Sequence, residues 1–287
     1  MTQQQSLRKK QIRIKPLIFA IFKYAILIGA VLIVFIPLLP IIFGSFKNSS
    51  EFLDSNVFAL PVNFTLENYI TAFLDGNMLL GFFNTGVILV ISLIISVITG
   101  AMTAYVLHRF RFKGHSLVKG LFLVAALLPS ITNNIATFQI VSFAGIFNTR
   151  LAGILLFSGT DIISVYIMLQ FLDHISVSLD ESAMMDGANY FTIFFKIILP
   201  LLMPAAITVA IIKGVAIYND FVTPYLFMPS SDLAMISTAL FNFQGPYAAQ
   251  WEVISAGIVI TAAPILIVFL ISQKWIYNGL VLGSVKE

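Results

Sequence analysis

The chain has 287 residues, of which 59% are hydrophobic and only 10% are charged. Soluble globular proteins are about 45–50% apolar and about 25% charged, so this composition predicts a membrane protein. The net charge of +3 gives no case for a nucleic-acid partner, and the lack of cysteine excludes disulfides and thiol nucleophiles. Three histidines, His108, His115 and His174, give a metal centre few ligands, and we expect neither a metal site nor catalytic residues.

The N-terminal segment MTQQQSLRKKQIRIK is basic and precedes an uncharged stretch from Tyr24 to Phe46. This stretch is longer than the roughly 7–15 apolar residues of a signal peptide, and no clear small-residue cleavage site follows it. We therefore predict an uncleaved first membrane helix. Residues 1–23 are then a cytoplasmic segment, and residues 24–287 form one membrane domain.

A membrane-spanning helix needs about 20 apolar residues, and the chain has six such stretches. Because backbone groups in lipid must bond within their own segment, we predict an all-α integral membrane protein with six transmembrane helices. The stretches are 24–43, 85–106, 120–140, 151–171, 197–218 and 253–272. Prolines are expected to bend several of them, namely Pro37, Pro129, Pro200, Pro204 and Pro264.

Lys and Arg are concentrated in alternate loops, which predicts that the N- and C-termini are cytoplasmic. The loop HRFRFKGHSLVKG at 108–120 is the second basic segment. Arg interleaved with aromatic residues can indicate nucleic-acid binding, but at a membrane face it indicates topology and lipid contacts. The outer segment 44–84 contains LPVNFTLENYITAF, which predicts an extended stretch and then a short helix capped by Thr65.

Several polar residues fall within or beside the predicted spans. Asn133 and Asn134 lie near the middle of the third span, where one amide can face a hydroxyl group and the other a partner helix. Tyr218, Asn219 and Asp220 lie where the fifth span reaches the outer face. All three can border a polar pathway between the spans, and the alternative is that Asn219 and Asp220 cap the following loop.

Two charged residues are predicted inside the membrane, Asp161 in the middle of the fourth span and Lys213 in the outer third of the fifth. Charges at such positions are costly and are candidates for function. Their predicted depths differ by about one helical turn (~5.4 Å). A structural ion pair, or a lysine that extends toward the interface, is the favoured interpretation, and a role in the solute pathway is the alternative.

The segment SVSLDESAMMDGANYF precedes the fifth span on the cytoplasmic side. Ser178 and Glu181 have the spacing of a capping box, and Asp180 and Glu181 suit the positive end of a helix dipole. Gly187 predicts a bend, after which a second short helix at 188–198 leads to the membrane. Met184 and Met185 either fit a partner's groove or pack on this chain's own helix ends.

This segment resembles the conserved cytoplasmic loop of binding-protein-dependent ABC importer permeases. Ten residues match the pattern of that loop, Glu181, Ala183, Asp186, Gly187, Ala188, Phe194, Ile197, Leu199, Pro200 and Pro204. Ser182 replaces the usual alanine, and HISVS at 174–178 replaces the common Ile-Pro. LPVNFTLENYITAF, AYVLHRFRFKGH, YNDFVTPYLFM and GLVLGSVKE also look like maltose-type, MalG-like sugar permeases, although SITNNIATFQIV lacks a second proline common there.

The resemblance implies an ABC importer type I transmembrane-domain fold in a bacterial cytoplasmic membrane. It implies that the loop at about 176–204 forms a coupling helix that docks on a separate ATPase, with Glu181, Ser182, Ala183, Met184, Met185, Asp186 and Gly187 as the coupling residues. The implied partners are a second permease, two ATPase subunits, an extracytoplasmic binding protein and a carbohydrate substrate. The chain has no Gly-Lys dipeptide and so no phosphate-binding loop; ATP and magnesium are expected on the partner subunits.

Three alternatives remain open. An ABC importer for a non-sugar solute has the same loop. An ion-coupled secondary transporter needs intramembrane carboxylates and usually internal repeats, whereas Asp161 is the one candidate carboxylate and no repeat is visible. A membrane-embedded enzyme needs clustered His, Asp or Glu near the interface, and no convincing cluster occurs in the sequence.

Overall fold

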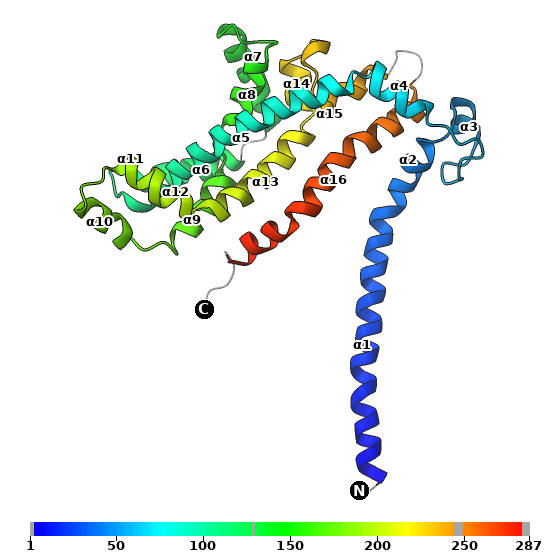
Figure 1. Cartoon of the computed structure of the whole chain (residues 1–287), viewed down its shortest axis with the longest axis horizontal. Helices are drawn as coiled ribbons and strands as arrows, with labels where there is room; N and C mark the ends of the chain where they lie inside the picture. Colours follow the sequence, from blue (N-terminus) through cyan, green and yellow to red (C-terminus); the bar gives the residue numbers. More distant parts are fainter. Residues whose placement is uncertain (1–2, 128–129, 244–248, 283–287) are drawn as a thin grey trace. The chain divides into compact units, whose positions relative to one another are not determined.

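The computed structural model describes residues 3–127, 130–243 and 249–282, and the regular elements in these ranges are helices (Figure 1). The packing divides the chain into two units. One unit consists of residues 1–72 and 243–260, and the other of residues 73–242 and 261–287.

The first unit begins with α1 (Gln3–Phe35), a short 3₁₀ turn η1 (Ile36–Leu38) and α2 (Leu39–Gly44). The apolar part, Phe19–Gly44, is 26 residues long and contains the predicted first span. Pro37 lies in η1, so the helix tightens where proline removes a backbone donor.

Two short helices follow in the segment that was predicted to lie outside, α3 (Ser49–Asp54) and α4 (Glu67–Asp75). Thr65 Oγ1 accepts a hydrogen bond from the backbone N–H of Glu67 at 3.1 Å. The predicted short helix and the Thr65 contact at its start are therefore present.

The second unit is built around α5 (Met78–Arg109), a 32-residue helix. Helices α8 (Arg150–Ser158), α9 (Ile162–Leu172) and α13 (Met203–Asn219) pack along it (Figure 1). The other elements are α6 (His115–Leu127), α7 (Ser130–Phe143), α10 (Ser178–Met185), α11 (Tyr190–Ile193), η2 (Phe194–Ile198), α12 (Leu199–Leu201), α14 (Val222–Phe227), η3 (Ser231–Leu233), α15 (Ile236–Ala239), η4 (Leu240–Phe243) and α16 (Trp251–Leu282), of which η4 and α16 continue into the first unit.

Two predicted spans are each made of two helices. The fifth span bends by 73° between Tyr190–Leu201 and α13, in the region of the predicted Pro200 and Pro204 bends. The fourth span bends by 44° between α8 and α9, although no proline is present there. Asp161, predicted at mid-span, instead lies at this break as the N-cap of α9. In contrast, α16 continues through Pro264.

Among the described residues, three helices are long and apolar enough to cross a membrane, and five spans result if each bent pair counts as one. The remaining predicted span, 120–140, covers α6 and α7. Residues 128–129, including Pro129, lie outside the described residues.

Two apolar clusters lie along α5 in the second unit. Near Arg109, Ala104 and Leu107 belong to a buried cluster with Met168 of α9 and Ala183 of α10. Farther toward Met78, a second cluster contains Ile88, Phe157, Ile217, Met228 and Met235. Because α5 contributes to both clusters, it connects the α10 side of the unit to the segment that follows α14.

Asn84 anchors that segment to α5. Its side chain is fully buried, and its Nδ2 donates to the backbone carbonyls of Asp232 and Ala234, each at 3.0 Å. Its Oδ1 accepts a hydrogen bond from Arg150 Nε at 2.9 Å. One amide therefore satisfies two carbonyls and one guanidinium.

We expect Asn84→Ala to lower the free energy of unfolding, because it leaves these three groups without their partner. The expected loss is about 1–3 kcal/mol, measured as a lower thermal midpoint of the detergent-solubilised protein. Asn63→Ala, at an exposed position, is the control and should leave the midpoint unchanged. Equal midpoints for Asn84→Ala and the parent protein would contradict the assignment of Asn84 as an anchor.

Candidate functional site: the coupling loop and the membrane pathway

The loop between the fourth and fifth spans forms a helix, a bend and a second helix, as predicted. Asp186 ends α10, and Gly187 has a φ of +82°, a conformation that favours glycine. The Gly187 N–H donates to the carbonyl of Met184 and the Ala188 N–H to that of Ala183, each at 2.9 Å. This is the Schellman pattern of a helix C-terminus. The second helix, α11, then starts after Asn189, whose side chain accepts from the Thr192 N–H at 2.9 Å.

The predicted capping box is wrong. Val177 is the N-cap of α10 and makes no side-chain cap, and Ser178 is the first helical residue. Ser178 Oγ instead lies 2.8 Å from Ser176 Oγ. The helix begins one residue earlier than predicted, because the Val177 carbonyl already accepts from the Glu181 N–H at 3.2 Å.

The predicted coupling residues are mostly exposed. Met185 is 89% exposed and Met184 39%, and Glu181, Ser182 and Asp186 are exposed as well. Ala183 is buried in the apolar cluster near Arg109. One face of α10 is thus fixed to this chain. In the part of the chain that the structure describes, its other face, with two methionines and two acids, is exposed and free for a partner.

Asp180, which was expected only to suit the helix dipole, is the residue that fixes this loop to α5. It is 3% exposed. Its Oδ1 accepts from Tyr105 Oη at 2.6 Å and its Oδ2 from Arg109 Nε at 3.1 Å. We call these three residues, Tyr105, Arg109 and Asp180, the Asp180 clamp.

Arg109 extends the clamp along the loop. Its Nη2 donates to the carbonyl of Ile175 at 2.9 Å, and its Nη1 lies 3.0 Å from His108 Nδ1. His108 Nε2 in turn lies 2.9 Å from Asp173 Oδ1, an exposed carboxylate. Arg109 was expected only as part of a basic topology signal, and its separation of 71 positions from Asp180 gave no sign of the pairing.

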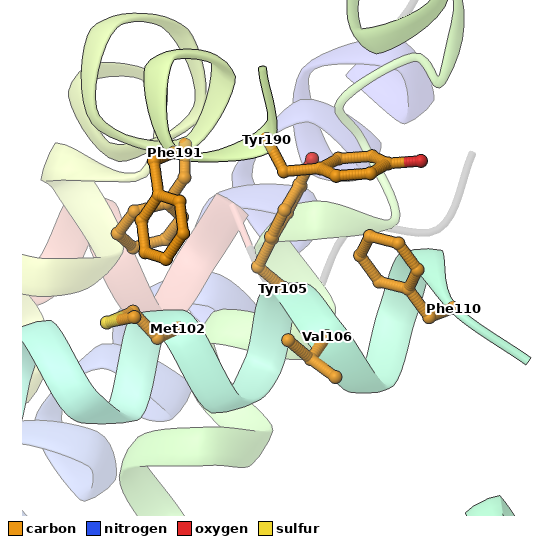
Figure 2. Close-up of a pocket in the computed structure, with 7 residues that line it drawn as sticks. Met102, Tyr105, Val106, Phe110, Tyr190 and Phe191 are labelled. Atoms are coloured by element: carbon orange, nitrogen blue, oxygen red, sulfur yellow. The ribbon is translucent and has the colours of Figure 1, made fainter. Parts of the chain in front are cut away.

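An apolar cleft of about 170 Å³ lies beside the clamp. Figure 2 shows Met102, Tyr105 and Phe110 of the α5 end facing Tyr190 and Phe191 of α11. The rings of Phe110 and Tyr190 are 5.1 Å apart, in an edge-to-face arrangement. Aromatic contacts therefore join α5 to the second arm of the loop.

The two predicted intramembrane charges do pair. Lys213 Nζ lies 3.3 Å from Asp161 Oδ2. Lys213 also donates to Ser96 Oγ of α5 and to the Gly159 carbonyl. Asp161 additionally accepts from the Ser164 N–H and Oγ, each at 2.8 Å. At the break between α8 and α9, Lys213 therefore bonds to the free carbonyl of Gly159 and Asp161 to the free N–H of Ser164.

A cavity of about 570 Å³ adjoins this pair, between the break and α13. Asp161, Lys213 and Asp220 line it together with apolar side chains such as Phe157 and Ile212. The Asp161 side chain is 43% exposed, which leaves carboxylate surface open to the cavity. We call this cavity the Asp161 niche.

The other predicted pathway residues are not gathered in one place. Tyr218 Oη donates to the Thr261 carbonyl of α16 at 2.8 Å. Asp220 accepts from the Thr223 N–H and Oγ1 at the start of α14, at 2.9 and 2.8 Å. Asn219 is exposed. On α7, Asn133 is exposed and Asn134 half-buried.

Known proteins are similar in sequence to this chain over most of its length. A permease of a transport system for starch degradation products from Thermoanaerobacterium thermosulfurigenes is 33% identical over 88% of this chain and 91% of its own. A probable ABC transporter permease of Bacillus subtilis is 32% identical over 87% and 83% of the two chains. An arabinooligosaccharide transport permease of Halalkalibacterium halodurans is 29% identical over 93% and 97%.

A solved structure shares the fold. It is a bacterial ABC transporter involved in import of the acidic polysaccharide alginate, with a TM-score of 0.77 over 90% of this chain and 96% of that chain, at 22% identity. The family model for the binding-protein-dependent transport system inner membrane component matches residues 96–281. This range includes the coupling loop, the Asp180 clamp and the Asp161 niche. The chain therefore belongs to the family of inner membrane components of binding-protein-dependent transport systems.

Proposed function

We propose that this chain is a permease subunit of an ATP-driven importer for an oligosaccharide or a similar carbohydrate. The permeases of starch degradation products and of arabinooligosaccharides, which it resembles over most of its length, support a carbohydrate substrate. The exposed face of α10 is the observation that carries the coupling role, since it presents Met184, Met185 and Glu181 away from the chain's own core.

The assembly that we propose contains a second permease, two ATPase subunits and an extracytoplasmic binding protein. ATP and magnesium bind to the ATPase subunits. The chain lies in a bacterial cytoplasmic membrane with both termini and the coupling loop inside, since Lys and Arg are concentrated on those segments. ATP-driven closure of the ATPases moves α10, and rigid-body motion of the spans then alternates access to the pathway.

The whole complex tests this function. An ATPase chain should co-purify with the permease, and the binding protein together with the correct sugar should stimulate ATP hydrolysis. A panel of oligosaccharides, with amino acids and peptides as non-sugar controls, identifies the substrate class. Purification without an ATPase would contradict the importer, and stimulation by a non-sugar solute alone would contradict the carbohydrate assignment.

We expect Gly187→Pro and Glu181→Lys each to remain in the membrane but to uncouple sugar uptake from ATP hydrolysis. Proline fixes φ near −65°, which is incompatible with the +82° at Gly187. Lysine reverses the charge on the exposed face of α10. The measurement is uptake into proteoliposomes beside ATPase activity of the same complex.

The matched control for the charge reversal is Asp173→Lys, because Asp173 is an exposed acid of the same connection but lies outside α10. This variant should retain coupled uptake. Undiminished uptake in both Gly187→Pro and Glu181→Lys would contradict the coupling role of the loop.

We propose that the Asp161–Lys213 pair is structural and that the solute passes along the Asp161 niche. The pair satisfies the Gly159 carbonyl where α8 ends, which supports the structural role. The remaining candidates for contacts with sugar hydroxyls are Asn133 and Asn219, which are exposed, and Asn134, which is half-buried. Tyr218 instead joins the end of α13 to α16 through the Thr261 carbonyl, and Asp220 accepts from the Thr223 N–H at the start of α14.

Reversing either charge of the pair should reduce the yield of assembled complex, since each reversal removes the Lys213–Asp161 pair and places two like charges beside each other in a span. The double exchange, Asp161→Lys with Lys213→Asp, should restore part of the assembly and uptake, because it pairs the two charges again but leaves the Gly159 carbonyl and the Ser164 N–H without their partners. Assembly and uptake are measured by size-exclusion chromatography and by sugar accumulation. Restored assembly without uptake would instead place the pair in contact with the solute.

A further inference from the structure

We propose that the coupling loop drives α5 as well as the two spans that it joins directly, with Tyr105 and Arg109 as the positioning residues that make α5 follow α10. The inference rests on the proposed function, because it requires that α10 be moved by an ATPase. In this proposal α5 is a third helix that moves with the loop and its two spans, and specific contacts hold α5 to the loop.

The Asp180 clamp fixes the first arm of the loop. The Asp180 side chain is 4% exposed, and the Arg109 side chain is 5% exposed. Movement of α10 away from α5 would leave a buried carboxylate and a buried guanidinium without partners, which is strongly unfavourable. Motion that keeps α10 and the Arg109 end of α5 together avoids this cost.

Aromatic packing fixes the second arm. The Tyr105 ring is 5.6 Å from the Phe194 ring of η2, and Phe194 is 4% exposed. The Phe110–Tyr190 contact adds a second pair across the cleft in Figure 2. Tyr105 therefore contacts both arms, by its hydroxyl group through Asp180 and by its ring through Phe194.

The rest of α5 is suited to transmit this motion. Its 32 residues form one uninterrupted helix of about 48 Å. At the Met78 end, Asn84 binds the carbonyls of Asp232 and Ala234, and Thr85 Oγ1 accepts from the Ile236 N–H at 2.9 Å. A displacement at Arg109 thus reaches the segment 232–236, which the predicted topology places outside. Binding at that face and closure of the ATPases are then linked, and the linkage is reciprocal.

Spin-label distances test whether α5 and the loop move together. Val106 and Phe191 line opposite walls of the cleft and are 44% and 68% exposed, and the chain has no native cysteine. Labels on Val106→Cys and Phe191→Cys are measured in the whole complex in nanodiscs, without nucleotide and trapped with ATP and vanadate. We expect the same distance distribution in both states. A shift between the states, with nucleotide shown to be trapped, would overturn the inference.

A double-mutant cycle tests the positioning residues themselves. Tyr105→Phe removes only the hydroxyl group, and Asp180→Asn keeps the side-chain volume but removes the charge. Each variant should raise the ATP hydrolysed per sugar imported by roughly tenfold, within the range of coupling between linked sites. Together they should raise it by no more than the larger single effect, because both act through one contact.

Asp173→Asn is the control, since it is the same substitution at an acid that is 71% exposed. It should leave the ratio unchanged, as exposed ion pairs contribute little. A normal ratio in Tyr105→Phe and Asp180→Asn would overturn the positioning role. If the parent complex contained no ATPase, the proposed function would fail as well. If the binding protein and sugar stimulated ATP hydrolysis by the parent complex but the distance between the two labels changed, only the inference about α5 would be contradicted.

Discussion

Asp180 lies almost out of contact with solvent, in a loop whose other acidic groups are exposed. A buried carboxylate is stable only when its charge is paired and its oxygens are bonded, and Tyr105 and Arg109 meet both conditions. The orientation of α10 depends on this contact, because it decides which face of the helix turns inward. Ala183 packs inside as a result, and Met185 and Glu181 stay available to a partner.

A second constraint comes from the membrane, where backbone groups that leave a helix must find partners within the protein. The break between α8 and α9 exposes the Gly159 carbonyl, and Lys213 of the neighbouring span donates to it while pairing with Asp161. The Lys213 ammonium group thus finds a hydrogen-bond acceptor at the break between α8 and α9, and the same bond stabilises the break. The cost of two charges in a span is offset by these bonds, and the break opens the Asp161 niche beside them.

The sequence was sufficient for those features that depend on local chemistry. Apolar stretches of spanning length predicted the membrane helices, and Gly187 predicted the bend after α10, because few other residues adopt a positive φ. Pro200 and Pro204 marked the 73° bend of the fifth span. The prediction failed at Ser178, where a matching motif lies one residue inside the helix, and at the break before Asp161, where no proline gives a signal.

The sequence alone therefore determined the class of protein, the positions of most of the apolar helices and the helix–bend–helix form of the loop before the fifth span, because hydrophobic length and glycine geometry act over a few neighbouring residues. Only the tertiary structure showed that Asp180 pairs with Arg109, across 71 positions. The pairing of Lys213 with Asp161 was the favoured interpretation from their predicted depths, and the structure added Ser96 and the Gly159 carbonyl as further partners of Lys213. Such partners are chosen by the packing of α5 against α9, α10 and α13, and distance along the chain carries no information about that packing.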